Sequence, residues 1–287
     1  MYEDNPEDLC SERLAAAVYR GSPLARPILG RRGTLEKMTG DGLRAYMHSH
    51  YRPNRIVVAL AGSFRDRDVE ELKARFSGLE PGPSPAEKQG RYQSAFTLKK
   101  KATEQNHLIL AFPGLSYRDE RRFALQLLSS TLGGGMSSRL WQEVREKRGL
   151  CYSVYSYASC HRETGLFGLY AALGREMEEE ALRTVCGVVR DYAEHGITQA
   201  ELDRAREQAK ANLLMGLEST QAHMSALGRG ELLEDRVLTP EEILAGYDAV
   251  SREDIRALAE ELFDFDALSL SAVGRVRSEE EYRALLD

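Results

Sequence analysis

The sequence predicts an α+β fold of two similar lobes, each a mostly antiparallel sheet with helices on one face, in which the first lobe is incomplete. Three observations lead to this class. Short apolar runs of strand length alternate with amphipathic helical segments. A short internal repeat relates the two parts of the chain. The 287 residues, 42% of them hydrophobic, are enough for two domains with their own cores.

The first part of the chain contains three expected helices and one expected strand. Asn5 or Asp4 precedes the first helix, and Pro6 stands in its first turn, where proline is well tolerated. The apolar run RIVVALA predicts a strand that ends at Gly62. The helices are expected at residues 6–20, 42–51 and 66–76, and the strand at 55–61.

The longer part that follows also mixes strands with helices. Expected strands occupy residues 93–99, 107–112, 150–158, 166–172 and 267–273. Expected helices occupy residues 118–132, 177–195, 199–217, a segment near 240, and 252–263.

The internal repeat divides the chain into lobes. When Gly274 is aligned with Gly62, Tyr51 falls on Phe263, and both places read helix, apolar strand, glycine and polar segment. If the lobes are equivalent, the first one lacks roughly 120 residues at its front. We therefore expect residues 1–80 to be the C-terminal remnant of the first lobe, 81–91 a proline-rich linker, and 92–287 the second lobe.

Composition narrows the class of protein. The net charge of −6 argues against nucleic-acid binding. Met1 is followed by acidic residues, and no apolar run approaches about 18–20 residues, so neither a signal peptide nor a membrane span is expected. The four cysteines lack CxxC spacing, which favours free thiols in a reducing cytoplasm. They are Cys10, Cys151, Cys160 and Cys186.

The segment 132–158, LGGGMSSRLWQEVREKRGLCYSVYSYA, is the part around which the second lobe is organised. Gly133, Gly134 and Gly135 are expected to end an apolar helix through left-handed backbone angles. The hydroxyl of Ser137 or Ser138 is expected to cap a new helix. The glycines between two helices point to a turn, and they also leave room for a substrate backbone to approach closely.

The new helix is expected to run to about residue 148, to stop at Gly149, and to lead into the strand at 150–158. Helical spacing gives it two faces. Leu140 and Val144 form the expected buried face, and Trp141, Arg145 and Arg148 share another.

Arg145 and Tyr152 are the candidate site residues. The corner from helix through glycine to strand is expected to bring the Arg145 guanidinium and the Tyr152 phenol close together. Arginine can clamp a peptide carbonyl, and tyrosine can donate a hydrogen bond to a developing oxyanion. The plainer alternative is a solvated arginine beside a packed tyrosine. A phosphate loop is excluded, because the preceding strand and the Lys-Ser/Thr ending are absent.

The string GGGMSSRLWQEVREKRGLCYSVYSY resembles the signature of the second domain in the insulinase, pitrilysin and mitochondrial-processing-peptidase family of zinc metallopeptidases. DNPEDL, GSPLARPILG and YRPNRIVVALAGSF in residues 1–80 resemble the later part of that family's first domain. The resemblance implies that Arg145 and Tyr152 reach the substrate. Arg145 and the three glycines would bind it, and Tyr152 would act in catalysis.

The same family holds a zinc ion with two histidines of an H-x-x-E-H helix and a distal glutamate. None of the six histidines here begins or ends that motif. No metal ligand is therefore assigned to this chain, and zinc is expected only in the complete protein. His161 and Glu163, in an expected hairpin loop, are expected to be solvated. Glu178, Glu179 and Glu180 are expected to be the favourable charges at a helix N-terminus.

The function that the resemblance implies is peptide hydrolysis by a zinc-dependent metalloendopeptidase. This chain would be a fragment of it that contributes substrate contacts and is inactive alone. The alternative is a non-catalytic partner subunit of a heteromeric peptidase, or a peptide-binding scaffold. Expected partners are a peptide or small protein substrate and the missing first-lobe half or a catalytic subunit, as a homo- or heterodimer. Neither nucleic acid nor membrane is expected to bind, and the expected location is cytoplasmic.

Overall fold

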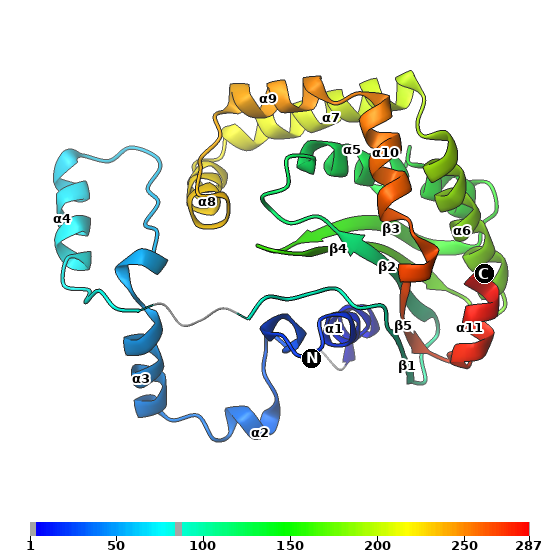
Figure 1. The fold of residues 1–287 in the computed structure, drawn as a ribbon, viewed down its shortest axis with the longest axis horizontal. Helices are drawn as coiled ribbons and strands as arrows, with labels where there is room; N and C mark the ends of the chain where they lie inside the picture. Colours follow the sequence, from blue (N-terminus) through cyan, green and yellow to red (C-terminus); the bar gives the residue numbers. More distant parts are fainter. Residues whose placement is uncertain (1–3, 84–87, 287) are drawn as a thin grey trace. The chain divides into compact units, whose positions relative to one another are not determined.

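A five-stranded sheet organises the larger part of the computed structural model, which describes residues 4–83 and 88–286 (Figure 1). The strand order is β1-β5-β2-β4-β3. The β1–β5 pair is parallel, and the other pairs are antiparallel. The strands are β1 (Phe96–Lys100), β2 (Asn106–Gly114), β3 (Cys151–Cys160), β4 (Gly165–Leu173) and β5 (Ser269–Gly274).

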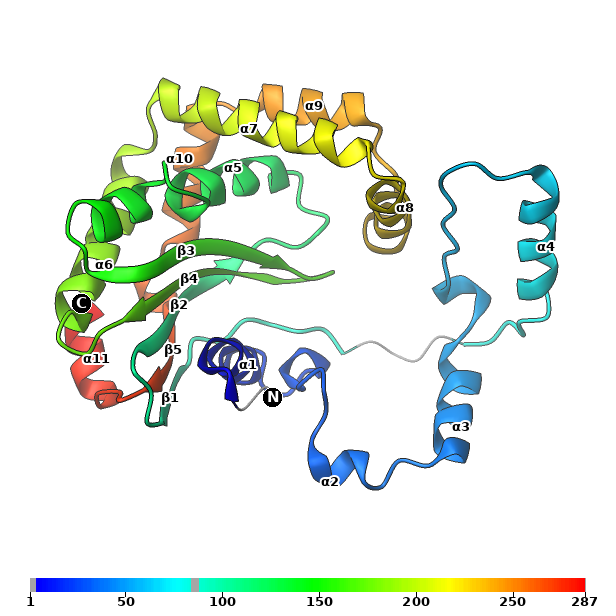
Figure 2. The same cartoon turned by 180° about the vertical axis from the view of Figure 1, so that it is seen from behind.

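One face of the sheet is covered by three helices, as Figure 2 shows from behind. They are α5 (Arg122–Gly133), α6 (Glu178–His195) and α10 (Arg252–Leu262). Aromatic rings join the two layers. Phe263, directly after α10, meets Phe112 of β2 and Phe167 of β4 edge-on, with ring centroids 5.2 and 5.5 Å apart. The last helix, α11 (Glu279–Leu286), packs on α6.

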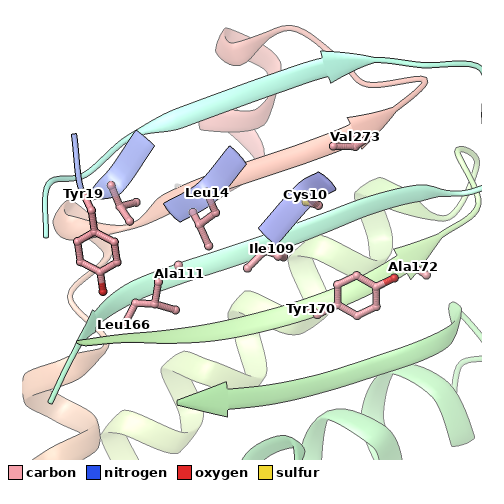
Figure 3. Packing of buried hydrophobic residues seen from close by; sticks show 10 residues of the cluster. Cys10, Leu14, Tyr19, Ile109, Ala111, Leu166, Tyr170, Ala172 and Val273 are labelled. Atoms are coloured by element: carbon pink, nitrogen blue, oxygen red, sulfur yellow. The ribbon is translucent and has the colours of Figure 1, made fainter. Parts of the chain in front are cut away.

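The opposite face of the sheet is covered by α1 (Pro6–Val18), as Figure 3 shows. The Asn5 side chain caps the N-terminus of this helix. Helix α1 buries Cys10, Leu14 and Val18 against Ile109 and Tyr170 of the sheet. The strands β2, β4 and β5 are buried along most of their length because both of their faces are covered. The predicted mostly antiparallel sheet with helices is confirmed, and α1 adds a layer that the sequence did not indicate.

Packing divides the chain into two compact units. The first consists of Met1–Arg26, Gln89–Ala209 and Leu244–Asp287, and the second of Pro27–Lys88 and Lys210–Ile243. These units do not follow the predicted domain boundaries, because α1 packs on the sheet formed by residues 92–287. Of the predicted linker 81–91, residues 84–87 lie outside the described residues. The assignment of residues 1–80 to an incomplete first lobe stays a prediction.

The second unit is helical. Its helices are α2 (Arg32–Leu35), α3 (Gly40–His50), α4 (Asp66–Phe76), the end of α7 (Gln199–Leu217), α8 (Thr220–Arg229) and the start of α9 (Pro240–Ala249). Among its described residues, no hydrophobic side chain is buried. Leu43, Tyr46 and Met47 form one exposed apolar face of α3.

The predicted strand at 55–61 is wrong, because this segment is irregular in the structure. A strand needs a hydrogen-bonded neighbour, and no strand within the described residues lies beside it. The apolar composition of this run is typical of a strand. The neighbouring strand that it would need for hydrogen bonding is absent from the described part of the chain. Val58 and Leu60 of this run are exposed.

The other predicted elements are confirmed, with their ends displaced by a few residues. The helix predicted at 118–132 begins at Arg122, because a turn closed by Asp119 precedes it. The four cysteines are free thiols, as predicted. Every helix in the described ranges is too short or too polar to cross a bilayer.

We expect the substitution Leu14→Ala to lower the free energy of unfolding by about 2–5 kcal/mol, because it leaves a cavity between α1 and the sheet. Urea denaturation followed by the fluorescence of Trp141, the single tryptophan, measures this change in the first unit. The control Ala16→Ser lies on the exposed side of α1 and should change stability by less than about 0.5 kcal/mol. Equal effects of the two substitutions would contradict the packing.

Candidate functional site

The site begins where α5 ends against the edge strand β3. A Cβ atom on Gly133 would lie 2.3 Å from the backbone nitrogen of Ser156, so only glycine permits this approach. The Ser156 hydroxyl donates a 2.8 Å hydrogen bond to the Ser129 carbonyl and ties the strand to the helix. Gly134 is equally restricted, since its Cβ would lie 2.6 Å from Cα of Ser130, whereas Gly135 has open space.

The expectation of left-handed backbone angles at Gly133, Gly134 and Gly135 is wrong. None of the three has a positive φ. Two of them are required by close packing, and the chain turns after α5 without help from the left-handed region. Gly149 does adopt the left-handed conformation, with φ of 64°, and ends the next helix as predicted.

The helix after the turn contains a π-turn, Trp141–Glu146. The π-turn is identified by the 3.0 Å hydrogen bond that the Lys147 N–H donates to the Gln142 carbonyl, five residues earlier in the chain. Of the two serines predicted to cap this helix, Ser137 and Ser138, the second does not do so, because its hydroxyl is buried without a hydrogen-bond partner among the described residues. The predicted buried face is confirmed, since Leu140 and Val144 are fully buried.

Tyr152 lies in a β-bulge at the start of β3. The register with β4 shifts between Cys151 and Ser153, which leaves Tyr152 as the extra residue. Its side chain is 74% exposed. The bulge therefore directs this phenol out of the sheet, at the strand end that adjoins the π-turn.

The Arg145 guanidinium lies close to two aromatic rings. Its central carbon is 3.9 Å from the centroid of the Trp141 ring and 4.8 Å from that of Tyr152. The predicted proximity of Arg145 and Tyr152 is confirmed. Arg148 takes no part in this stack, because its guanidinium forms an ion pair with Glu143 at 2.7 Å.

The basic residues near the stack of Trp141, Arg145 and Tyr152 differ in whether a carboxylate pairs with them. Glu143 also pairs with Lys147, so one carboxylate serves two of the helix's cations. No carboxylate of the described residues forms an ion pair with Arg145. Burial raises the pKa of the neighbouring Cys151 thiol to about 11, although the Arg145 charge acts to lower it. That thiol is neutral near pH 7 and is a poor nucleophile.

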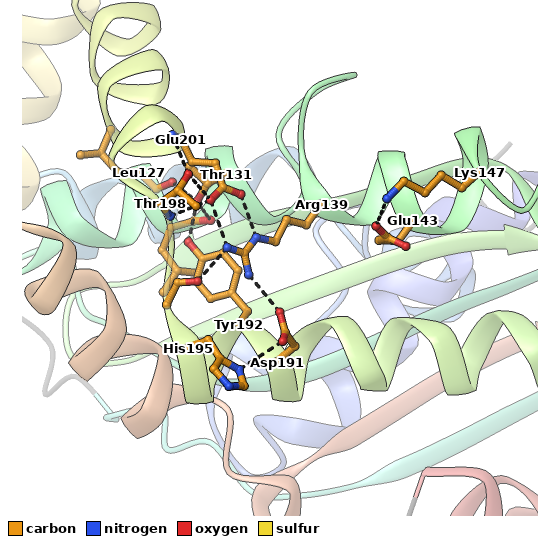
Figure 4. Close-up of polar contacts among 12 residues, drawn as sticks. Leu127, Thr131, Arg139, Glu143, Lys147, Asp191, Tyr192, His195, Thr198 and Glu201 are labelled. Carbon is orange, nitrogen blue, oxygen red and sulfur yellow. Dashed lines mark hydrogen bonds and ion pairs between the residues drawn. The ribbon is translucent and has the colours of Figure 1, made fainter.

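Arg139 anchors the beginning of the same helix (Figure 4). Its guanidinium donates hydrogen bonds of 2.8 and 3.0 Å to Glu201 and of 2.8 Å to the Gly196 carbonyl. It pairs with Asp191 at 3.2 Å and lies over the Tyr192 ring. The sequence reasoning missed this residue. Its position directly after the two serines was the available signal, but its partners lie more than 50 residues away along the chain.

Comparison with known proteins identifies the family of this chain. Residues 37–209 match the family described as peptidase M16 inactive domain. The chain belongs to the peptidase M16 family. It is 39% identical over 272 residues to the uncharacterized zinc protease YmxG of Bacillus subtilis, and 38% identical over 293 residues to an uncharacterized zinc protease of Streptomyces coelicolor. These matches cover 94% and 99% of the chain, but only 66% and 64% of the two relatives. The chain thus spans slightly less than two thirds of their length.

Solved structures show the same M16 fold. The crystal structure of a peptidase M16 inactive domain from Pseudomonas fluorescens superposes with a TM-score of 0.87 at 27% identity, over 96% of this chain and 68% of that one. A protease from Helicobacter pylori superposes with a TM-score of 0.84 at 19% identity, over 95% and 68% of the two chains. The second likeness concerns the fold alone.

Zinc, which the M16 relatives' names imply, does not fit the described residues of this chain. Within residues 4–83 and 88–286, no group of three histidine, cysteine, aspartate or glutamate side chains is placed to hold a metal ion.

Glu178 opens α6 as expected, but it is fully buried. It accepts hydrogen bonds from Asn106 and, at 3.0 Å, from Arg277. The expectation of a solvated His161 is wrong, because its half-buried ring packs edge-on against Tyr19.

We expect Gly133→Ala to destabilise the M16 domain by about 1–3 kcal/mol, because the added methyl group collides with the backbone of β3. The matched control is Gly135→Ala, where nothing lies within 4 Å of the new atom. This substitution should change the free energy of unfolding by less than about 0.5 kcal/mol. Urea denaturation measures both values. A tolerated Gly133→Ala would show that α5 and β3 do not need this close contact.

The ion pair of Arg139 with Glu201 predicts a pH dependence of stability. Burial alone would raise the pKa of Glu201, but hydrogen bonds from Arg139 and Thr198 outweigh it and lower the pKa to about 2. Because this value lies below the ordinary 4.5, the stabilisation is complete above about pH 4.5 and is lost as the pH falls through 2.

We therefore expect wild type to be more stable than Glu201→Gln by about 2–3 kcal/mol at pH 7. The difference should shrink as the pH is lowered from 4.5 towards 2. Denaturation of both proteins across this range tests the expectation. A stability difference that does not change with pH would show that the carboxylate charge of Glu201 is not what stabilises the fold.

Proposed function

We propose that this chain supplies the substrate-binding and oxyanion-stabilising part of a zinc-dependent metalloendopeptidase. Arg145 would bind a carbonyl of an extended peptide, and Tyr152 would donate a hydrogen bond to the oxyanion that develops at the scissile bond. The observation that carries the proposal is that two irregularities meet at this corner. The π-turn holds Arg145, and the β-bulge holds Tyr152. Such irregularities cost stability and are frequent at functional sites.

The surroundings of Arg145 suit the binding of a neutral peptide. Both rings lie within cation–π distance of the guanidinium, whose N–H donors lie in its own plane. An arginine paired with a carboxylate would have these donors occupied. With no such partner among the described residues, Arg145 can direct them at peptide carbonyls.

Tyr152 suits the second role because its phenol is exposed and lies beside a fixed positive charge. A cation 4.8 Å from the ring favours negative charge that develops near the hydroxyl during the reaction. The phenol O–H is a donor for the same oxygen. Arg145 and Tyr152 would thus act on neighbouring atoms of one peptide.

The three glycines, Gly133 to Gly135, have different roles in this proposal. The space beside Gly133 and Gly134 is filled by the protein itself, so these two residues shape the site. Gly135 has open space on its side-chain side, and we assign to it the close approach of a substrate backbone.

The zinc and the activated water belong, in this proposal, to a part of the complete protease outside the described residues. The second unit supports this, because its apolar side chains lack a buried core of their own. The exposed face of α3 and the apolar run 55–61 are the surfaces that a metal-bearing lobe would cover. Residues 1–80 would then be the later part of that lobe.

The alternative is a non-catalytic subunit that offers Arg145 and Tyr152 to a separate metal-bearing partner. Both arrangements use the same site. They differ in whether an H-x-x-E-H helix is encoded upstream in the same reading frame, which the genomic sequence decides.

In the complete protease, we expect Tyr152→Phe to lower kcat by a factor of about 10²–10³, because an oxyanion donor is lost. Arg145→Ala should raise KM and lower kcat, because it removes contacts made both before and during the reaction. Steady-state cleavage of a fluorogenic peptide measures these constants. The control Arg148→Ala removes a cation of the same helix that is already paired with Glu143, and it should leave both constants near wild type.

If Tyr152→Phe turns over at the wild-type rate, Tyr152 has no part in the reaction. If Arg145→Ala behaves like Arg148→Ala, the helix face is merely solvated and the proposed function fails.

A further inference from the structure

We infer that Trp141 is a positioning residue that holds the Arg145 guanidinium in the orientation needed to bind a peptide. This inference rests on the proposed function and adds a residue to it. Trp141 and Arg145 are four positions apart on one short helix, and the indole is the nearer of the two rings at 3.9 Å. Trp141 is half-buried, and the Arg145 guanidinium lies over its ring.

The other basic residues of this helix are held by carboxylates. Arg139 is fixed by Glu201, and Lys147 and Arg148 are fixed by Glu143. Each of these cations uses N–H donors to satisfy a carboxylate. Arg145 has rings in place of a carboxylate within the described residues.

A ring holds a guanidinium in a different way from an acid. It attracts the positive charge through its π face and leaves the in-plane N–H donors unoccupied. Trp141 can therefore restrict the rotamers of Arg145 without competing with a peptide for its donors. An unrestrained arginine would have to lose that rotational freedom on binding, which lowers affinity.

The two rings have different tasks. Tyr152 is largely exposed and is assigned to the substrate, so its position is free to change when a peptide binds. Trp141 comes from the same helix as Arg145 and stays beside it whatever the strand does. The indole is therefore the fixed side of the stack, and the phenol is the side that faces substrate.

The kinetic test uses the complete protease and the fluorogenic peptide. Trp141→Leu should raise KM about 3–10-fold with little change in kcat, because it removes a cation–π contact and not a donor to the transition state. Trp141→Phe should recover most of the loss, since a ring is restored. In an Arg145→Ala background, Trp141→Leu should have no further effect, because the two residues act through one contact.

A second measurement tests the stack without substrate. Trp141 is the only tryptophan of this chain, so its fluorescence reports on this contact. Quenching by acrylamide should increase in Arg145→Ala, which uncovers one face of the indole, and should stay at the wild-type level in Arg148→Ala. Circular dichroism and urea denaturation confirm that each variant is folded.

The outcomes separate the two claims. If Arg145→Ala weakens cleavage but Trp141→Leu leaves KM unchanged, the inference is overturned and the proposed function stands. If Trp141→Leu and Trp141→Phe are equally impaired, an aromatic face is not what matters, and the inference is likewise overturned. If Arg145→Ala changes neither kinetic constant, the proposed function fails, and with it the use that we assign to the stack.

Discussion

The close approach of α5 to β3 is the constraint on which the site depends. At Gly133 the helix backbone touches the strand backbone at Ser156, and no side chain fits between them. This contact fixes the point from which the chain turns into the short helix. Arg139 fixes the start of that helix by binding Glu201 and the Gly196 carbonyl. Between these anchors and the glycine corner at Gly149, the π-turn has little freedom, and Arg145 inherits a defined position.

The basic residues of the helix that carries Arg145 are held in two different ways. Most are paired with acids, and such pairs on an exposed surface contribute little to stability. Arg145 lies against aromatic rings and forms no ion pair with the carboxylates of the described residues. In the proposed role, its N–H donors are the groups that a peptide backbone would satisfy.

The two compact units differ in what stabilises them. The first has a sheet covered on both faces and a large set of buried apolar side chains. The second has amphipathic helices whose apolar faces are exposed within the described residues. A helix gains most of its stability by burying such a face. The second unit therefore lacks this source of stability among its described residues.

The family, most helices and strands in residues 92–287, and the proximity of Arg145 and Tyr152 could be predicted from the order of amino acids, whereas the helices α8 and α11 were not predicted. The family follows from the resemblance of several motifs. The elements and the Arg145–Tyr152 corner follow from local rules, namely hydrophobic period, glycine at a corner, and the spacing of two residues across it. The remaining features required the three-dimensional packing of the chain. The layer formed by α1, the packing role of Gly133, the clamp on Arg139 and the failure of the strand at 55–61 all depend on residues distant in the chain. The π-turn and the β-bulge also depend on distant residues, because a strained local conformation persists only where the surrounding packing stabilises it.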